Sequence, residues 1–361
     1  MANIAMERRF GMGKKTVAVL FGGCSPEYDV SLKSAYSIIN AINREKYEVI
    51  LVGITRQGRW YKYSGDVEDI PDDRWHVDQS RMKSVIISPS RGDGLYEFRN
   101  GLAVSMPVDV VFPVLHGKYG EDGTVQGLCE LAGIPVVGSG SAASALCMDK
   151  DRAHKLVSLA GLRVPRSVCF EYVPSDDEVL SAGKDLGLPL FVKPVKAGSS
   201  IGMTKVEDDS ELLEAVKLAL EYDDAVIFEE FIDGFETGCS VVGNYELKTG
   251  RIDEIELSHG FFDYEEKYTL KTSKIHMPAR IDEEMERRLQ DAAKTIYRVL
   301  GCRGYARVDI FLNSKREIVF NEANTIPGFT AHSRFPNMMK GVGIEYPELV
   351  DMLIELGLSN N

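Results

Sequence analysis

The sequence lacks the signatures of several common classes of protein. No apolar run approaches the roughly 18 residues of a membrane-spanning helix, and the first residues contain no long apolar segment typical of a secretory signal. Basic residues are in deficit, since 42 Lys and Arg stand against 55 Asp and Glu, a net charge of −13. Because non-specific nucleic-acid binding needs a basic surface, we expect neither a nucleic acid nor a membrane as partner.

Metal and redox motifs built from cysteine or histidine are also missing. No two of the six cysteines form a Cys-x-x-Cys pair, and the six histidines contain no His-Glu-x-x-His. Zinc chemistry is therefore not expected. Most of the cysteines lie in apolar stretches, which indicates buried free thiols and a cytoplasmic location.

The pattern that is present predicts an α/β protein of several packed units. The length of 361 residues favours two or three such units. Residues 14–140 alternate strands and helices, which predicts a doubly wound, Rossmann-like domain with a parallel sheet. Residues 141–236 predict a small central domain, and 237–361 an α+β domain that begins strand-rich. We interpret residues 1–13 as a leader or an expression remnant.

Apolar runs and helical spacings predict the individual elements within these units. The expected strands are 16–21, 47–54, 109–115, 134–137, 190–194, 203–206, 225–231, 306–312 and 317–321. The expected helices are 31–42, 124–131, 151–160, 210–222 and 283–300. In a doubly wound sheet, functional groups should lie at the carboxyl ends of the strands.

A loop rich in glycine and serine carries the first chemical signal. Residues 193–202 read Lys-Pro-Val-Lys-Ala-Gly-Ser-Ser-Ile-Gly, which lets backbone N–H groups and lysines converge on an anion. It is not a P-loop, since Gly-x-x-x-x-Gly-Lys-Ser/Thr does not occur. It does match Gly-x-Ser-x-Gly at Ser200, but a hydrolase elbow needs a helix next and 203–206 predicts a strand. A phosphate-covering loop is favoured over a plain hairpin turn.

Two neighbouring strands near the end of the chain carry hard oxygen ligands. Asp309 follows Arg307 and Val308, and Glu322 and Asn324 end the next strand. Two carboxylates and an amide oxygen suit Mg²⁺, with water and phosphate oxygens completing the octahedron. Three solvated polar residues at strand ends are the alternative, and the nearby phosphate loop favours the metal.

Three further groups fit the binding of small molecules. Glu229, Phe231 and Ile232 follow an apolar strand, where backbone and side chain could bind an adenine edge, or form a solvated edge strand. Glu27 lies on the turn after the first strand, and His116 begins a glycine-rich segment after another. A carboxylate at such a strand end can hold a substrate ammonium, or simply place a charge at a helix N-terminus.

Taken together, these residues resemble the D-alanine–D-alanine ligase family of ATP-grasp enzymes. The resemblance runs from Val17 to about Leu356, and its many ordered motifs make it specific. The segments that carry it are 20–32 (Leu-Phe-Gly-Gly-Cys-Ser-Pro-Glu-Tyr-Asp-Val-Ser-Leu), Leu-His-Gly at 115–117, Gly-Glu-Asp-Gly at 120–123, Met-Asp-Lys at 148–150, Lys-Pro at 193–194, Gly-Ser-Ser-Ile-Gly at 198–202, Glu-Glu-Lys-Tyr at 265–268, Arg-Val-Asp at 307–309 and Asn-Glu-Ala-Asn-Thr-Ile-Pro-Gly at 321–328.

The resemblance implies an ATP-grasp fold, ATP as a substrate and two Mg²⁺ ions, with Mn²⁺ as a substitute. It assigns Asp309, Glu322 and Asn324 to the metal ions. It assigns the following residues to ATP: Lys150, Lys193 and Lys267 to the phosphates, Glu229, Phe231 and Ile232 to the adenine, Glu236 to the ribose, and Ser200 and Asn321 to the same site.

The resemblance also implies a reaction. ATP would convert the D-alanine carboxylate into an acyl phosphate, which the amine of a second D-amino acid then attacks. The implied roles are as follows: Glu27 and His116 for the first D-alanine, Arg307 and the Gly328 N–H as donors to the carboxylate and then the oxyanion, and Ser199 and Tyr268 as a latch with Glu27 that closes a mobile loop.

Two stretches depart from the ordinary family pattern and resemble the vancomycin-resistance ligases, particularly the D-alanine–D-serine group. The ordinary His-Ser-Leu is here His332, Ser333 and Arg334, whose N–H donors could reach a serine hydroxyl directly or through a carboxylate such as Asp263. The retained Tyr268 argues against D-lactate. D-Serine is favoured, with an ordinary D-alanine–D-alanine ligase as the alternative and Arg334 then a salt-bridged surface residue.

More remote alternatives are a non-catalytic nucleotide-binding module and a serine hydrolase. A binding module would not need the full set of metal ligands and oxyanion donors, and a hydrolase needs a helix after Ser200. The expected partners are D-alanine, D-serine or a second D-alanine, ATP, and a second copy of the chain in a homodimer. The product would be a dipeptide precursor of peptidoglycan.

Overall fold

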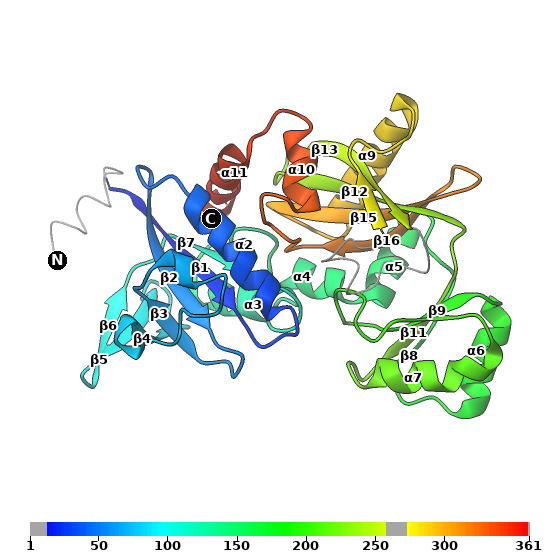
Figure 1. Ribbon diagram of the computed structural model, residues 1–361, viewed down its shortest axis with the longest axis horizontal. Coiled ribbons are helices and arrows are strands. Elements are labelled where there is room, and N and C mark those ends of the chain that lie inside the picture. Colours follow the sequence, from blue (N-terminus) through cyan, green and yellow to red (C-terminus); the bar gives the residue numbers. More distant parts are fainter. Residues whose placement is uncertain (1–12, 258–272, 360–361) are drawn as a thin grey trace.

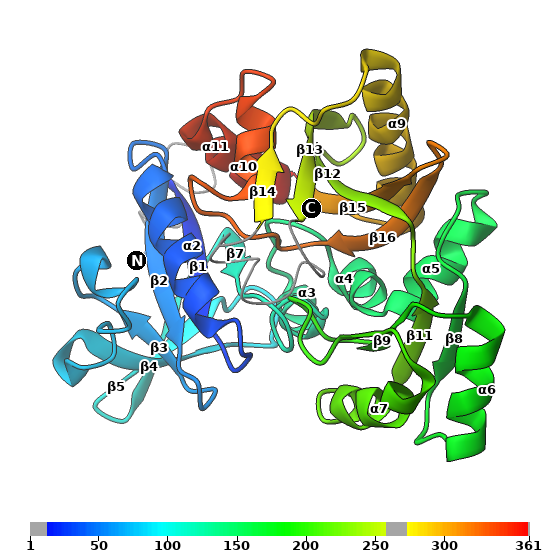
Figure 2. The same ribbon diagram turned by 45° about the vertical axis from the view of Figure 1, so that its right-hand side comes forward.

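The computed structural model describes residues 13–257 and 273–359, which form three β-sheets with helices packed on them (Figures 1 and 2). The first sheet uses strands from the beginning of the chain, the second from its middle and the third from its last third. The α/β fold class expected from the sequence is confirmed.

The first sheet has a parallel core and an antiparallel extension. β1 (Lys15–Gly22) pairs in parallel with β2 (Tyr47–Ile54) and β7 (Val110–Val114). The order β6-β5-β4-β3-β2-β1-β7 adds four antiparallel strands that the sequence did not predict. Their bounds are β3 Trp60–Tyr63, β4 Met82–Ile87, β5 Leu95–Arg99 and β6 Leu102–Met106.

The strand expected at 134–137 is wrong, because this segment forms only an isolated bridge between Val111 and Val136. Pro135 lies within the segment and has no N–H to extend a ladder.

Helices cover both faces of the parallel core, as a doubly wound sheet requires. Odd-numbered residues of β1 pack with residues of α2 and α11, and even-numbered residues with those of α3. Seven of the eight β1 residues are consequently buried. The bounds are α2 Tyr28–Ala41, α3 Thr124–Ala132 and α11 Tyr346–Leu358. The last helix of the chain thus completes the core of the first sheet (Figure 1).

The second sheet is antiparallel, in the order β10-β9-β11-β8, with two helices over one face. A capping box between Ser175 and Glu178 starts α6. The bounds are β8 Ser167–Phe170, β9 Leu190–Pro194, β10 Thr204–Val206, β11 Val226–Glu230, α6 Asp176–Leu186 and α7 Leu212–Leu220.

The third sheet is also antiparallel, in the order β14-β13-β12-β15-β16. α9 packs its apolar face on one side of it, and α10 packs on β12 and β13. The bounds are β12 Gly234–Val242, β13 Lys248–Leu257, β14 Ser273–His276, β15 Tyr305–Asn313, β16 Ile318–Asn324, α9 Glu283–Val299 and α10 Arg334–Lys340.

Two helices in the middle of the chain, α4 and α5, both contact β16 of the third sheet. Together with three short 3₁₀ turns they complete the described elements. The bounds are α4 Ser141–Met148, α5 Lys150–Leu159, and 3₁₀ turns at Val67–Asp69, Gln79–Arg81 and Asp209–Glu211.

The cysteines are all unpaired by disulfides, as the sequence indicated. Burial is confirmed for Cys129, Cys147, Cys239 and Cys302, whereas Cys24 is exposed. No described helix has the length and apolar character needed to cross a membrane.

Candidate active site

A cleft of about 430 Å³ is lined by strands of the second and third sheets. All the described residues that the sequence assigned to ATP lie on its wall: Lys150, Lys193, Ser200, Glu229, Phe231, Ile232, Glu236 and Asn321. Lys267, the remaining member of that set, lies outside the described residues. The cleft also includes residues that the sequence did not single out, among them Phe191, Met203, Glu254, Arg280 and Phe311.

A buried ion pair lies on the wall of this cleft. Lys193 on β9 and Glu229 on β11 belong to adjacent antiparallel strands, and Lys193 Nζ lies 2.6 Å from Glu229 Oε2. Burial opposes ionisation of Glu229, but Lys193, with further contributions from His154 and Lys150, holds the pKa of this carboxyl below its ordinary value. Opposite charges thus lie side by side, where an amino group and a phosphate of one ligand could bind.

Apolar rings form the neighbouring wall. The Phe231 ring lies 6.2 Å from that of Phe191 at an interplanar angle of 33°, and Lys205 Nζ lies 5.3 Å from the Phe231 centroid. Phe231 is 39% exposed, so its ring is open to a ligand. Such a surface suits a planar base, because aromatic side chains stack on flat rings.

The glycine–serine loop at 198–202 joins β9 to β10 beside the cleft. Ser199 and Ser200 adopt left-handed backbone conformations, with φ of +51° and +58°, which are uncommon outside glycine. Lys150 Nζ donates to the carbonyl of Ala197, 2.6 Å away. A strand, β10, follows the loop where a hydrolase elbow would have a helix, so the hydrolase alternative loses its structural basis.

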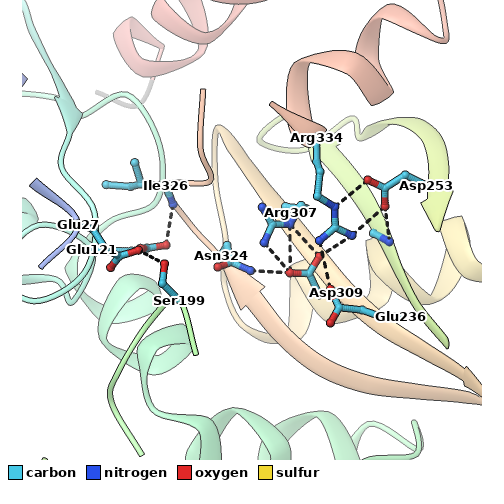
Figure 3. Close-up of polar contacts among 11 residues, drawn as sticks. Glu27, Glu121, Ser199, Glu236, Asp253, Arg307, Asp309, Asn324, Ile326 and Arg334 are labelled. Atoms are coloured by element: carbon cyan, nitrogen blue, oxygen red, sulfur yellow. Dashed lines mark hydrogen bonds and ion pairs between the residues drawn. The ribbon is translucent and has the colours of Figure 1, made fainter. Parts of the chain in front are cut away.

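The candidate metal ligands lie together on one face of the third sheet. Asp309 on β15 is the register partner of Glu322 on β16, and Arg307 is the partner of Asn324. Residues two apart on a strand share a face, so these four side chains point to the same side. The Asp309 carboxylate accepts bonds from Arg307 Nε (2.8 Å), Arg307 Nη2 (2.7 Å) and Asn324 Nδ2 (2.9 Å) (Figure 3).

Carboxylate and amide oxygens, such as those of Asp309, Glu322 and Asn324, are ligands that Mg²⁺ prefers. Over residues 13–257 and 273–359, no group of three or more His, Cys, Asp and Glu could hold a metal ion. Among the described residues, Asp309, Glu322 and Asn324 would hold Mg²⁺, and water and phosphate oxygens would complete its coordination, as is usual for this ion. Glu322 also lines the cleft, which brings these ligands beside the candidate phosphate site.

Arg334, the first residue of α10, points into the same face of the third sheet (Figure 3). Its side chain is 9% exposed. The guanidinium contacts three carboxylates: Asp253 through Nε (2.7 Å) and Nη2 (2.8 Å), Glu236 through Nη1 (3.1 Å) and Asp309 through Nη2 (3.6 Å). The alternative from the sequence placed Arg334 in a salt bridge at the surface. The salt bridge is present, but the surface location is wrong because the side chain is buried.

Asp253 is the partner that the sequence missed, and nothing in its local pattern distinguishes it from other acidic strand residues. It is fully buried on β13. Asp263, suggested from the sequence as a neighbouring carboxylate, lies outside the described residues.

Gly238 makes room for the Arg334 guanidinium. In strand register Asp253, Gly238, Asp309 and Glu322 form one row across four strands. A Cβ at Gly238 would lie 2.5 Å from Arg334 Nη2 and 2.7 Å from Asp253 Oδ1. The Gly238 N–H instead donates to Asp253 Oδ1 at 2.8 Å. A side chain in the middle of this row would therefore displace the arginine.

A second group of candidates lies at the carboxyl ends of the parallel strands of the first sheet. Glu27 follows β1, is buried, and accepts a hydrogen bond from Ser199 of the glycine–serine loop (Figure 3). His116 follows β7, and its Nδ1 lies 2.8 Å from the carbonyl of Ile326. Burial lowers the pKa of His116, which keeps the ring neutral at pH 7. Tyr268, the third member of the expected latch, lies outside the described residues.

The segment after β16 brings Gly328 close to Ser333. A Cβ at Gly328 would lie 3.5 Å from Ser333 Oγ. Ser333 Oγ also accepts the N–H of Thr330 at 2.9 Å, which folds the segment back toward α10. The candidate oxyanion donor and the candidate second-substrate residues are thus neighbours.

Glu121 is a further residue of this region whose own role the sequence left open. It lies in the Gly-Glu-Asp-Gly motif, and its Oε1 accepts the N–H of Ile326 at 3.0 Å (Figure 3). Burial, and then the charge of Glu27, raise the pKa of Glu121 to about 7.

Comparison with known proteins gives the family. The model of the D-Ala-D-Ala ligase N-terminus matches residues 16–139, and that of the D-Ala-D-Ala ligase C-terminus matches residues 156–355. The vancomycin C-type resistance protein VanC1 of Enterococcus gallinarum is 44% identical over 95% of this chain and 98% of its own length. A D-alanine–D-alanine ligase of Caldicellulosiruptor bescii is 42% identical over 97% of both chains.

A solved structure is similar over nearly the same span. The VanG D-Ala:D-Ser ligase from Enterococcus faecalis superposes with a TM-score of 0.89 and 56% identity, covering 95% of this chain and 99% of that one. With two family models spanning most of the chain and full-length relatives above 40% identity, the chain belongs to the D-alanine–D-alanine ligase family of ATP-grasp enzymes.

Proposed function

We propose that this ligase joins D-alanine to a second D-amino acid, D-serine in preference to D-alanine, through a D-alanyl phosphate. The observation that carries D-serine is the buried cluster of Arg334 with Asp253 and Glu236 on the candidate active-site face. The name of the VanG relative, a D-Ala:D-Ser ligase, supports the same choice.

The first step is activation of a poor electrophile. A carboxylate oxygen of D-alanine attacks the γ-phosphorus of ATP, the bond to the β-phosphate oxygen breaks, and ADP leaves. Lys150 and Lys193 would neutralise phosphate oxygens, and Glu229 and Phe231 would hold the base. Mg²⁺ held by Asp309, Glu322 and Asn324 would supply further positive charge to the phosphates.

The second step forms the peptide bond. The amine of the second amino acid attacks the acyl carbonyl, and phosphate leaves once the tetrahedral oxyanion collapses. Arg307 and the Gly328 N–H would donate to this oxyanion, a contribution of about 2.7–4 kcal/mol for each donor. Glu27 would hold the ammonium of the first D-alanine, with His116 beside it, and the latch with Ser199 and Tyr268 would exclude water from the acyl phosphate.

The preference for serine follows from the polarity of the Arg334 cluster. A serine hydroxyl both donates and accepts, so it can bond a guanidinium N–H and a carboxylate together. A methyl group in the same place would desolvate these charges without compensation. Ser333, at the start of α10 beside Gly328, is proposed to contact the same substrate.

Product analysis tests the proposal. The purified chain is incubated with ATP, Mg²⁺, D-alanine and equal concentrations of D-serine and D-lactate, and phosphate release and products are measured by mass spectrometry. D-Alanyl-D-serine as main product is expected. D-Alanyl-D-alanine as main product would favour the ordinary ligase, and ATP binding without phosphate release would favour a binding module.

Physiological roles follow from the same proposal. The dipeptide would serve as a peptidoglycan precursor, and a D-serine terminus would fit the vancomycin resistance in the name of VanC1. A homodimer and a cytoplasmic location stay predictions, and so do the limits of the three domains, which sedimentation, fractionation and limited proteolysis can measure.

A further inference from the structure

The peptide backbone at Ile326 is hydrogen-bonded on both sides by side chains from the loops of the first sheet. Its N–H donates to Glu121 Oε1 at 3.0 Å, and its carbonyl oxygen lies 2.8 Å from His116 Nδ1. Residues 325–330 contain neither helix nor strand, so no ladder fixes this segment. Beyond Pro327, further side chains hold the segment: Ser34 Oγ accepts the N–H of Phe329 at 3.2 Å, Tyr346 Oη donates to the Phe329 carbonyl at 2.6 Å, and Ser333 Oγ accepts the N–H of Thr330 at 2.9 Å.

The position of Ile326 matters because Gly328, the candidate oxyanion donor, lies two residues further on. Only Pro327 lies between them, and its ring fixes φ near −65°. Few rotatable bonds therefore separate the anchored peptide from the Gly328 N–H. A shift of the Ile326 peptide is transmitted to that donor.

Glu121 also contacts the wall of the candidate ammonium site. Its Oε2 accepts the N–H of Gly117 at 3.4 Å, and its own N–H donates to the Gly117 carbonyl at 2.8 Å. Gly117, in turn, lies against Glu27, since a Cβ there would be 2.5 Å from Glu27 Oε2. One carboxylate thus connects the backbone beside Glu27 to the backbone before Gly328.

Stabilisation of its own loop does not account for the contacts of Glu121. The neighbouring Asp122 already organises the loop, accepting the N–H groups of Tyr119 (2.8 Å) and Thr124 (3.1 Å). The bond from Ile326 to Glu121 joins residues 205 positions apart. The place is also unfavourable for a carboxylate, because burial and Glu27 disfavour its ionised form.

We propose that Glu121 is a positioning residue of the ligase reaction, holding the Ile326 peptide so that the Gly328 N–H meets the reacting carbonyl. The proposal rests on the proposed function of Gly328. A donor misplaced by about 1 Å can lower a rate by about a hundredfold, so loss of this contact should appear in kcat.

Two conservative variants distinguish the effect of the length of the Glu121 side chain from the effect of its charge. Glu121→Gln keeps an acceptor oxygen at the same reach but removes the charge, whereas Glu121→Asp keeps the charge but is one methylene too short for Ile326. We expect Glu121→Gln to retain kcat within about tenfold of wild type and Glu121→Asp to lose about a hundredfold. The KM for ATP should stay within about threefold in both, since neither touches the nucleotide cleft.

Asp122→Ala is the matched control, since it removes loop bonds that do not reach Ile326. It should lower the melting temperature while leaving kcat within about threefold of wild type, because its bonds to the Tyr119 and Thr124 N–H groups stabilise the loop and do not touch the Ile326 peptide. Dipeptide formation, ATP kinetics and thermal unfolding are measured for all four proteins.

Several results would overturn the positioning role while wild type forms the dipeptide. These are a kcat of Glu121→Asp within threefold of wild type, a Glu121→Gln variant that is slower than Glu121→Asp, or losses of kcat that simply follow the melting temperature across the variants. A wild-type protein that makes no D-alanyl dipeptide would instead overturn the proposed function, and this inference with it.

Discussion

Replacement of Arg334 by leucine removes the cation from a buried cluster of carboxylates. Asp309 would keep Arg307 and Asn324 as donors, and Glu236 is 16% exposed and can be partly solvated. Asp253 has neither advantage: its side chain is 1% exposed, and its other described donor is the Gly238 N–H. We therefore expect the loss of stability to come mainly from the Asp253 carboxylate, which stays buried without its cation.

The magnitude follows from the burial of this pair. Removal of one partner of a buried, hydrogen-bonded ion pair costs about 3–5 kcal/mol, because the other charge stays desolvated. We expect Arg334→Leu to lower the free energy of unfolding by that amount at pH 7. The double variant Arg334→Leu/Asp253→Asn should recover more than half of the loss, since it no longer buries an unpaired charge.

Urea unfolding of the ligand-free proteins, followed by circular dichroism, measures these differences. Arg163→Leu is the control, because Arg163 and its nearer partner Glu317 are both roughly half exposed and such a pair is worth about 0.2–1 kcal/mol. The second partner, Glu230, lies 3.7 Å away and keeps Arg166 as a donor when Arg163 is removed. A loss below 1 kcal/mol in Arg334→Leu, or a double variant no more stable than the single one, would refute the account of a buried pair.

The same Arg334→Leu protein tests the substrate role. A charged hydrogen bond to the serine hydroxyl is worth about 1.5–3 kcal/mol, so the ratio of D-serine to D-alanine incorporation should fall about tenfold to a hundredfold. A ratio that does not fall, measured on the folded fraction, would leave Arg334 with a structural role only.

Three further predictions concern the other parts of the site. Glu322→Ala should lose turnover by several orders of magnitude with its circular dichroism unchanged, because a carboxylate opposite Asp309 is removed; near-normal ATP-dependent phosphate release would contradict the metal assignment. Tyr268→Phe should increase the share of ATP hydrolysed without dipeptide, since water reaches the acyl phosphate; unchanged coupling would argue against the latch. Because burial and Glu27 raise the pKa of Glu121 from 4.5 to about 7, the folded protein holds a proton there that the unfolded chain has released, so stability should decline as pH rises from about 5 to 8. Urea unfolding of wild type and Glu121→Gln over this pH range should show that the free energy of unfolding declines more steeply with pH in wild type. An equal decline in both proteins would contradict a raised pKa of Glu121.

Local pattern was enough to predict the elements that carry the site. The run that became β1 is apolar at nearly every position, as a strand buried on both faces requires, and the glycine–serine loop is followed by the strand that its sequence indicated. The chemistry of the side chains also identified the candidates for the nucleotide site, because carboxylate and amide oxygens, lysines and a glycine–serine loop occur together in few other kinds of site. The antiparallel extension of the first sheet was missed because its strands are only four to six residues long and many of their residues are exposed or half-buried, which leaves too short a burial pattern to read from the sequence.

Local motifs were sufficient to select candidate residues and to place Lys193, Glu229, Asp309 and Glu322 on or at the end of strands that the structure contains. Which charges meet depends instead on the packing of distant segments. The ion pair of Arg334 with Asp253 joins residues 81 positions apart, and it exists because Gly238 leaves a gap between them. The bond from Ile326 to Glu121 likewise depends on how the loops of the first sheet meet the end of the third. Contacts between distant segments leave no periodicity in the chain, because burial and pairing belong to the packed sheets and not to any single stretch of residues.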